Sequence, residues 1–284
     1  MARTLKRGSA DILRPGWFVY AALAAVVVAA LFPFYWSLLV GSGDASTVRD
    51  PNMSWIPGGN FLDNAVSVIQ NPAVNFWKAL GNSIIVSTTV AVSTVVLSTL
   101  AGFAFARLRF KGNGVLYVAV IATMAVPVQL GVVPLYILMA EYGWTGSLGA
   151  VIVPALVTAF GVFWMTQYLQ QSLPYELIEA ARVDGCNMIR TFWHVAVPAA
   201  RPAAAMLFLF TFVTAWNNFF WPLIILDQSN PTLPVALSML QANYFVDYSL
   251  VLTGVLLATV PLLILFVFTG RQLVTGIMQG ALKG

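Results

Sequence analysis

The sequence predicts an all-α, polytopic membrane protein with six transmembrane helices and with both termini in the cytoplasm. The evidence is its composition, the lengths of its apolar stretches and the placement of its basic residues. Of the 284 residues, 60% are hydrophobic and 8% are charged, whereas a soluble domain carries about 25% charged residues. A soluble fold of this length could not cover its surface with so few charges, so we expect lipid to be part of its solvent.

Six stretches contain no Asp, Glu, Lys or Arg, and each is longer than the roughly 20 residues that a helix needs to cross the hydrocarbon core. These stretches are 15–43, 79–106, 112–140, 142–175, 202–226 and 248–270. The spans predicted within them are 16–40, about 80–106, about 114–140, about 146–170, about 202–225 and about 249–270. The first is expected to be a retained span and not a cleaved signal peptide, because bulky residues stand at 32–36 where a small-residue cleavage site would lie. Pro127 and Pro134 interrupt the third stretch, Pro154 the fourth and Pro261 the sixth.

Basic residues gather on one side of this topology. Twelve of the 14 Lys and Arg residues lie in the N-tail 1–15, the turn 107–111, the loop 172–201 and the C-tail 271–284. The opposite side, which includes the loops 41–78 and 226–248, holds two basic residues and six acids. Because cytoplasmic loops are enriched in Lys and Arg, both termini are predicted to be cytoplasmic.

The loop 41–78 contains apolar residues at helical spacing. Leu62, Ala65, Val66 and Ile69 fall at i, i+3, i+4 and i+7. This spacing predicts a short amphipathic helix on the outer surface before the second span.

The predicted spans lack the side chains that intramembrane chemistry needs. None contains Asp, Glu, Lys, Arg or His, which proton relays and ion-coupled carriers commonly place near the midplane. His194 and Cys186 are single and lie in the loop 172–201, so we predict no metal site and no catalytic residues. The chain also lacks the GxxxxGK[ST] loop that cradles nucleotide phosphates. Either the energy for its function comes from another protein, or the chain is a stand-alone secondary carrier or channel.

The cytoplasmic loop 172–201 has a helix–glycine–helix pattern. Ser172-Leu-Pro174 is typical of a helix start, and Gly185 can end that helix in a left-handed conformation. A second short helix is expected from about 187 to 195, ending near Pro198. Each helix carries an apolar patch: Leu177, Ile178 and Ala181 on the first, and Ile189, Phe192 and Trp193 on the second. Such patches predict docking into a groove of another protein, or packing of the loop against the membrane or its own helix ends.

The same loop resembles the EAA motif of bacterial ABC-importer permeases, EAA–x3–G–x9–I–x–L–P. Glu179-Ala180-Ala181, Gly185 and Pro198 match the motif, with Val195 and Val197 in place of Ile and Leu. Five other segments resemble carbohydrate permeases of the group that contains the smaller maltose-transporter permease: 55–57, 101–107, 133–136, 215–223 and 280–284. The resemblance covers nearly the whole chain, with the permease core at 79–284.

The resemblance implies a type I ABC-importer permease fold and a set of partners in the bacterial inner membrane. These are a second permease subunit that completes a heterodimer, a dimer of ATP-binding subunits that holds ATP and Mg, and an extracytoplasmic sugar-binding protein. This chain would bind no cofactor and no nucleic acid. The substrate would be a di- or oligosaccharide; maltodextrins, cellobiose-type β-glucosides, trehalose, chitobiose and glycerol phosphodiesters all remain open.

The resemblance also implies roles for particular residues. The ATPase-docking element would consist of Glu179, Ala180, Ala181, Asp184, Gly185 and Pro198. The outer-loop residues Asp227, Gln228, Ser229 and Asn230 are candidates for contact with the binding protein, and the C-tail 276–284 for contact with the ATPase dimer. Each of the last two segments is equally open to being an ordinary turn or terminus.

One polar pair in the fifth span is a candidate for the sugar pathway. Asn217 and Asn218 are flanked by Trp216 and Trp221, and sugars favour amide hydrogen bonds and aromatic faces. The alternative is that these amides bond neighbouring helices, as transmembrane amides often do.

Overall fold

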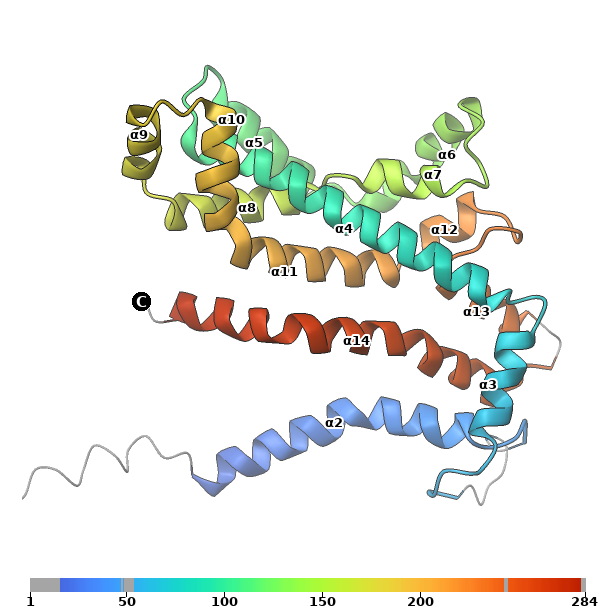
Figure 1. The fold of residues 1–284 in the computed structure, drawn as a ribbon. Coiled ribbons are helices and arrows are strands. Elements are labelled where there is room, and N and C mark those ends of the chain that lie inside the picture. Colours follow the sequence, from blue (N-terminus) through green and yellow to red (C-terminus); the bar gives the residue numbers. More distant parts are fainter. Residues whose placement is uncertain (1–15, 47, 49–53, 243–244, 282–284) are drawn as a thin grey trace, which may run out of the picture. The chain divides into compact units, whose positions relative to one another are not determined.

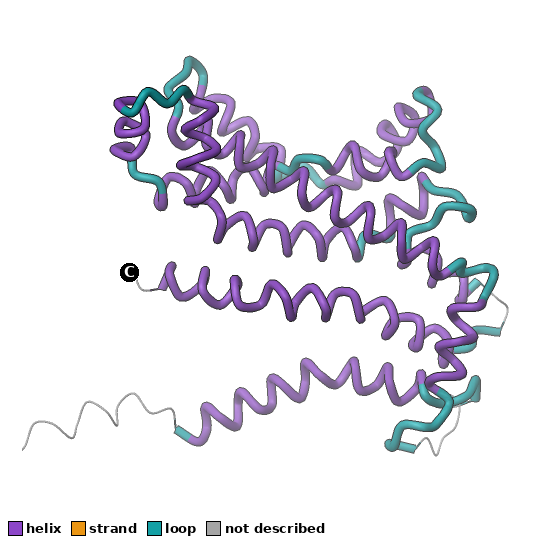
Figure 2. Tube along the Cα trace, viewed as in Figure 1, coloured by secondary structure: helices purple, strands orange, loops and turns teal. Residues whose placement is uncertain are grey.

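The computed structural model describes residues 16–46, 48, 54–242 and 245–281, and within these ranges all regular structure is helical (Figures 1 and 2). The predicted all-α class is therefore confirmed. The chain divides into two compact units, one of 1–67 with 247–257 and the other of 68–246 with 258–284.

The first unit joins α2 (Trp17–Gly41) to the beginning of α14 (Tyr248–Ala281) and to α3 (Phe61–Gln70). The Thr253 hydroxyl donates to the Gly41 carbonyl at 2.8 Å, and the Asn64 amide donates to the carbonyls of Gly41 and Gly43, both at 2.9 Å. These bonds satisfy carbonyls that a helix end leaves without intrahelical partners. Most of α2 is exposed, as expected for a uniformly apolar helix whose solvent is lipid.

The predicted amphipathic helix is α3, but its apolar residues divide between two faces. Of the four predicted residues, Ala65 is buried and Ile69 partly buried, whereas Leu62 and Val66 are exposed. The structure therefore places half of the expected apolar stripe against the protein and leaves the other half open.

The second unit is organised by α4 (Phe76–Arg107), whose most extensive contacts are with α8 (Ala159–Ser172) and α11 (Val197–Trp216) (Figure 1). The buried positions of α4 include many small residues, which let helix backbones approach closely in a membrane. They include Ala79, Ser83, Ser87, Ala91, Thr94, Ser98 and Gly102. At Gly102 the contact with α8 is close, because a Cβ atom there would lie 2.8 Å from Cβ of Met165. Trp164 of α8 also donates its indole N–H to the Ala203 carbonyl of α11 at 3.1 Å.

Among the residues that the structure describes, five helices are long and apolar enough to cross a membrane: Trp17–Gly41, Phe76–Arg107, Leu148–Ser172, Met188–Trp216 and Tyr248–Thr269. A sixth span requires a bent pair, because the predicted span 114–140 is divided into α5 (Asn113–Thr123) and a segment Val128–Glu141, which are bent by 89°. That second segment contains η2 (Val128–Gly131) and α6 (Val132–Glu141). Pro127 stands at the break, where it offers no backbone N–H and disfavours helical geometry in the residue before it.

The other prolines have different effects. Pro134 lies in the first turn of α6, a position where a missing N–H costs little. Pro154 lies in η3 (Val153–Ala155), which follows α7 (Leu148–Ile152) and precedes α8. Pro261 lies inside α14 without ending it, and that helix continues to Ala281, through most of the predicted C-tail.

We expect replacement of Gly102 by alanine to weaken the contact between α4 and α8. The added methyl group would overlap Met165, and overpacking of this kind costs about 1–3 kcal/mol. Thermal unfolding of the detergent-solubilised protein should therefore shift to a lower temperature. The matched control is Gly81→Ala on the same helix, where nothing lies within 4 Å of the new Cβ atom. An equal effect of the two substitutions would contradict the packing assigned to Gly102.

Candidate functional site

The helix–glycine–helix loop begins with α9 (Tyr175–Val183), which ends as the sequence predicts. Gly185 has φ +78°, the left-handed conformation that glycine adopts without steric cost. The Cys186 N–H donates to the Ala181 carbonyl at 2.9 Å, and the Gly185 N–H donates to the Arg182 carbonyl at 3.0 Å. This pair of bonds is a Schellman motif, which satisfies the last carbonyls of the helix.

One face of α9 packs against the chain's own core. Ile178 is fully buried in a cluster with Leu169 and Leu173, at the end of α8, and with Phe192. Ala181 is also buried. Of the two alternatives predicted for the patch of Leu177, Ile178 and Ala181, packing against the chain's own helix ends applies to Ile178. The core takes the Ile178 and Ala181 side of the helix and leaves Leu177 half exposed, at 49%.

The sequence predicted that the second helix of the loop ends near Pro198, but the helix continues past this residue. It begins at α10 (Met188–Thr191), passes through the π-helical segment η4 (Phe192–Ala196) and continues as α11. Pro198 has no N–H to donate to the carbonyl of the preceding turn, and the widened turn of η4 accommodates this loss just before the proline. Pro198 therefore lies in the first turn of α11 and does not terminate a helix.

Four large apolar side chains of the loop remain exposed: Leu177 at 49%, Val183 at 87%, Ile189 at 70% and Trp193 at 56%. Glu179, Ala180 and Asp184 are exposed beside them. We call these seven residues the docking face. Exposed apolar side chains of this kind can contact another protein or lipid, and the two carboxylates can pair with basic groups.

A turn that follows α4 contacts both helices that flank the start of the loop. Arg107 donates from Nη2 to the carbonyls of Leu169 at 2.9 Å and Gln170 at 2.7 Å, both in the last turn of α8. The guanidinium of Arg109 lies over the ring of Tyr175, 5.3 Å from its centroid. The sequence marked these arginines only as charges on the cytoplasmic side; their position directly after a long apolar stretch was the available signal that they reach a neighbouring helix end.

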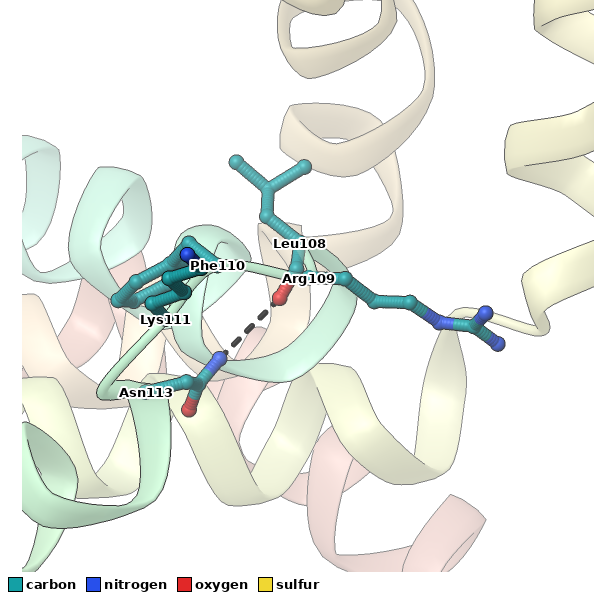
Figure 3. Close-up of a pocket in the computed structure, with 5 residues that line it drawn as sticks. All are labelled: Leu108, Arg109, Phe110, Lys111 and Asn113. Carbon is teal, nitrogen blue, oxygen red and sulfur yellow. Dashed lines mark hydrogen bonds between the residues drawn. The ribbon is translucent and has the colours of Figure 1, made fainter.

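The same turn forms a shallow hollow of about 500 Å³, lined by Leu108, Arg109, Phe110, Lys111 and Asn113. The Asn113 amide donates to the Leu108 carbonyl at 3.1 Å and closes the turn (Figure 3). Figure 3 also shows the Arg109 side chain extending to the opposite side of the turn from Phe110 and Lys111. The two cations therefore do not converge on one ligand position.

The amide pair of the fifth span lies at a break between α11 and α12 (Phe220–Ile225). Asn217 and Asn218 are exposed, and Asn217 donates to the Val213 carbonyl at 2.9 Å. The flanking tryptophans use their indole N–H groups within the chain, Trp216 to the Ala258 carbonyl at 3.2 Å and Trp221 to the Ala150 carbonyl at 3.0 Å. The tryptophans thus hold neighbouring helices together, while the amides remain open to a partner or a solute.

The outer loop at 227–230 precedes α13 (Leu233–Ser238) and η5 (Met239–Gln241). Asp227 accepts hydrogen bonds from the Ser229 hydroxyl at 2.6 Å and from the Ser229 N–H at 2.9 Å. The hydroxyl bond is the main reason that the pKa of the Asp227 carboxyl lies below its ordinary value. Gln228 is exposed, as are Asp227 and Ser229.

Asn230 faces inward and fastens this outer loop to two other segments. Its amide nitrogen donates to the Gly146 carbonyl at 3.0 Å, and its amide oxygen accepts from Asn82 of α4 at 2.9 Å. Of the four candidate contact residues, Asn230 therefore has a structural role, and the exposed edge consists of Asp227, Gln228 and Ser229. Across the part of the chain that the structure describes, no group of three or more His, Cys, Asp or Glu side chains could hold a metal ion.

Comparisons with known proteins concern the chain as a whole. Residues 73–274 match the family described as the binding-protein-dependent transport system inner membrane component. The chain is 31% identical to the arabinooligosaccharides transport system permease protein AraQ of Halalkalibacterium halodurans, over 99% of this chain and 100% of the relative. It is 32% identical to the lactose transport system permease protein LacG of Rhizobium radiobacter, over the full length of both.

A solved structure shares the fold. It is a bacterial ABC transporter involved in the import of the acidic polysaccharide alginate, and it matches with a TM-score of 0.75 at 20% identity. The match covers 94% of this chain and 98% of the other.

Replacement of Asn230 by alanine should loosen the outer loop. It removes both hydrogen bonds of the side chain and leaves the Asn82 amide without one of its acceptors, at a cost of about 1–2 kcal/mol. Amide hydrogen exchange at residues 226–232 should become faster. The control is Gln228→Ala, which alters an exposed side chain in the same loop and should leave exchange unchanged; faster exchange in the control alone would contradict the assignment.

Proposed function

Because the chain belongs to the family of binding-protein-dependent transport system inner membrane components, we propose that it is the permease subunit of an ATP-driven importer for a di- or oligosaccharide. The observation that carries the proposal is the docking face, which lies on a loop that is anchored to the chain's own core by Ile178 and Phe192. The sugar class is supported by relatives named for arabinooligosaccharides and lactose.

In this proposal the loop has two faces with separate tasks. The docking face enters a groove on an ATP-binding subunit, as an amphipathic helix does in many protein complexes. Glu179 and Asp184 meet basic groups on that partner. Ile178 acts from the opposite side, because it is buried in one cluster with Leu173 and Ala200 and so transfers movement of the loop to the ends of α8 and α11. Ala181 is buried as well. ATP and Mg are held by the partner dimer and not by this chain.

A second permease subunit completes the pathway, of which this chain forms half. Asn217 and Asn218 lie at the break in the fifth span, where exposed amides can hydrogen-bond a passing sugar. On the opposite side of the membrane from the docking face, Asp227, Gln228 and Ser229 are proposed to contact the extracytoplasmic sugar-binding protein. The C-tail 276–284 is proposed to contact the ATPase dimer. The complex would lie in the bacterial inner membrane.

Reconstituted alone in liposomes, this chain should carry no sugar, because it holds neither an energy source nor the second half of the pathway. With the partner permease, the ATPase and the binding protein present, uptake of radiolabelled sugar should depend on ATP. Sugar flux through the isolated chain would overturn the importer proposal and favour a stand-alone carrier or channel.

Replacement of Gly185 by valine should weaken association with the ATPase while membrane insertion stays intact. Valine at φ +78° costs about 1–2 kcal/mol relative to glycine and would distort the Schellman turn that orients the docking face. The amount of ATPase that co-purifies with the permease should fall. Gly185→Asn is the control, because asparagine tolerates the left-handed conformation and should retain most of the ATPase. Equal retention by the two variants would count against docking through this loop.

A further inference from the structure

The turn after α4 reaches two consecutive elements, although they lie more than 60 residues further along the chain. Arg107 contacts the last turn of α8, and Arg109 contacts the first residue of α9. Only Leu173 and Pro174 separate the end of α8 at Ser172 from Tyr175. A single turn therefore spans the junction at which the docking loop joins the membrane helices.

The Arg107 contact is a charged cap. The carbonyls at the end of a helix carry the negative end of the helix dipole, so a guanidinium that donates to two of them is well matched. The Leu169 carbonyl also accepts from the Leu173 N–H at 3.2 Å. Arg107 is half-buried, which reduces competition from water. The result is that the end of α4 is fastened to the end of α8.

The Arg109 contact is of another kind. Its guanidinium lies over the face of Tyr175, where the ring quadrupole attracts a cation. Arg109 itself is exposed while Tyr175 is partly buried. The contact requires an aromatic ring at position 175 and does not involve the tyrosine hydroxyl group.

The turn also leads directly into α5, the first half of the bent pair. Gln167 of α8 donates to the Tyr117 hydroxyl of α5 at 3.0 Å. The start of α5 is thus connected with the docking loop in two ways. Arg109, which precedes α5 in the chain, contacts Tyr175, and Tyr117 of α5 is hydrogen-bonded to α8, which leads into the loop. A displacement of α9 at Tyr175 would act first on this turn.

We propose that Arg107 and Arg109 are positioning residues that join the docking helix α9 to the inner ends of α4 and α5, and so convert movement of the ATPase into movement of the bent span. This inference rests on the proposed function. Arg107 keeps the turn fixed on α8, and Arg109 transmits the displacement of Tyr175 to it. Neither residue belongs to the docking face.

The test uses the complete importer in liposomes and measures sugar molecules transported per ATP hydrolysed. Tyr175→Leu and Arg109→Gln should each lower this ratio by about two- to fivefold, the factor that corresponds to an exposed cation–π contact. The double variant should be no worse than either single variant, because both remove the same interaction. Tyr175→Phe keeps the ring and should match the unchanged protein, and Arg107→Lys should retain more activity than Arg107→Gln because it keeps a charged donor.

The amount of co-purified ATPase should be the same in all of these variants. An unchanged transport ratio in Tyr175→Leu and Arg109→Gln would overturn the inference, as would fully additive losses in the double variant. Loss of assembly in these variants would also contradict it, because the two arginines are assigned to transmission and not to docking. Failure of the proposed function is distinguishable, since the unchanged protein would then retain no ATPase and carry no sugar.

Discussion

The close approach of α4 to α8 and α11 is the contact on which the rest of the second unit depends. Gly102 allows the backbone of α4 to lie directly on Met165, and a Cβ atom on Gly161 would meet both Ser98 and Thr94 of α4. Helices in lipid gain little from hydrophobic burial against one another, so small residues that permit close packing decide which helices pair. This packing brings the ends of α4 and α8 together and creates the core on which Ile178 rests.

Hydrogen bonds from side chains explain how the chain can interrupt its helices. Unsatisfied polar groups are costly in hydrocarbon, so irregular segments need internal partners. Side chains of neighbouring helices supply several of them: Trp221 donates to the Ala150 carbonyl, Asn82 to the Pro231 carbonyl, and the Ser83 hydroxyl accepts from the Leu233 N–H. Asn82 and Ser83, which are polar residues in an apolar stretch, thus satisfy backbone groups where the helical structure is interrupted.

The fold class and the start and end of α9 could be predicted from the sequence, because they depend on local composition and on single residues such as Pro174 and Gly185. Which apolar residues of α9 are buried could not be predicted from the sequence. Leu177 and Ile178 are equally apolar, and only the position of α8 decides which of them is covered. The continuation of the loop's second helix past Pro198 into α11 was missed for a related reason. A proline predicts a helix end unless a neighbouring turn widens, and no residue signals that widening. The contacts of Arg107 depend on residues 62 and 63 positions away, beyond any local pattern.

The π-helical segment η4 has a consequence for how sequence changes in this region should be judged. A π-turn holds one residue more than an α-turn, so the residues before it are rotated by about 100° relative to an uninterrupted α-helix. Ile189 owes its outward direction to that extra residue. A single-residue deletion between 192 and 196 would restore a regular helix and turn Ile189 away from its present direction. The direction of Ile189 therefore depends on how many residues this segment contains, whatever their identities.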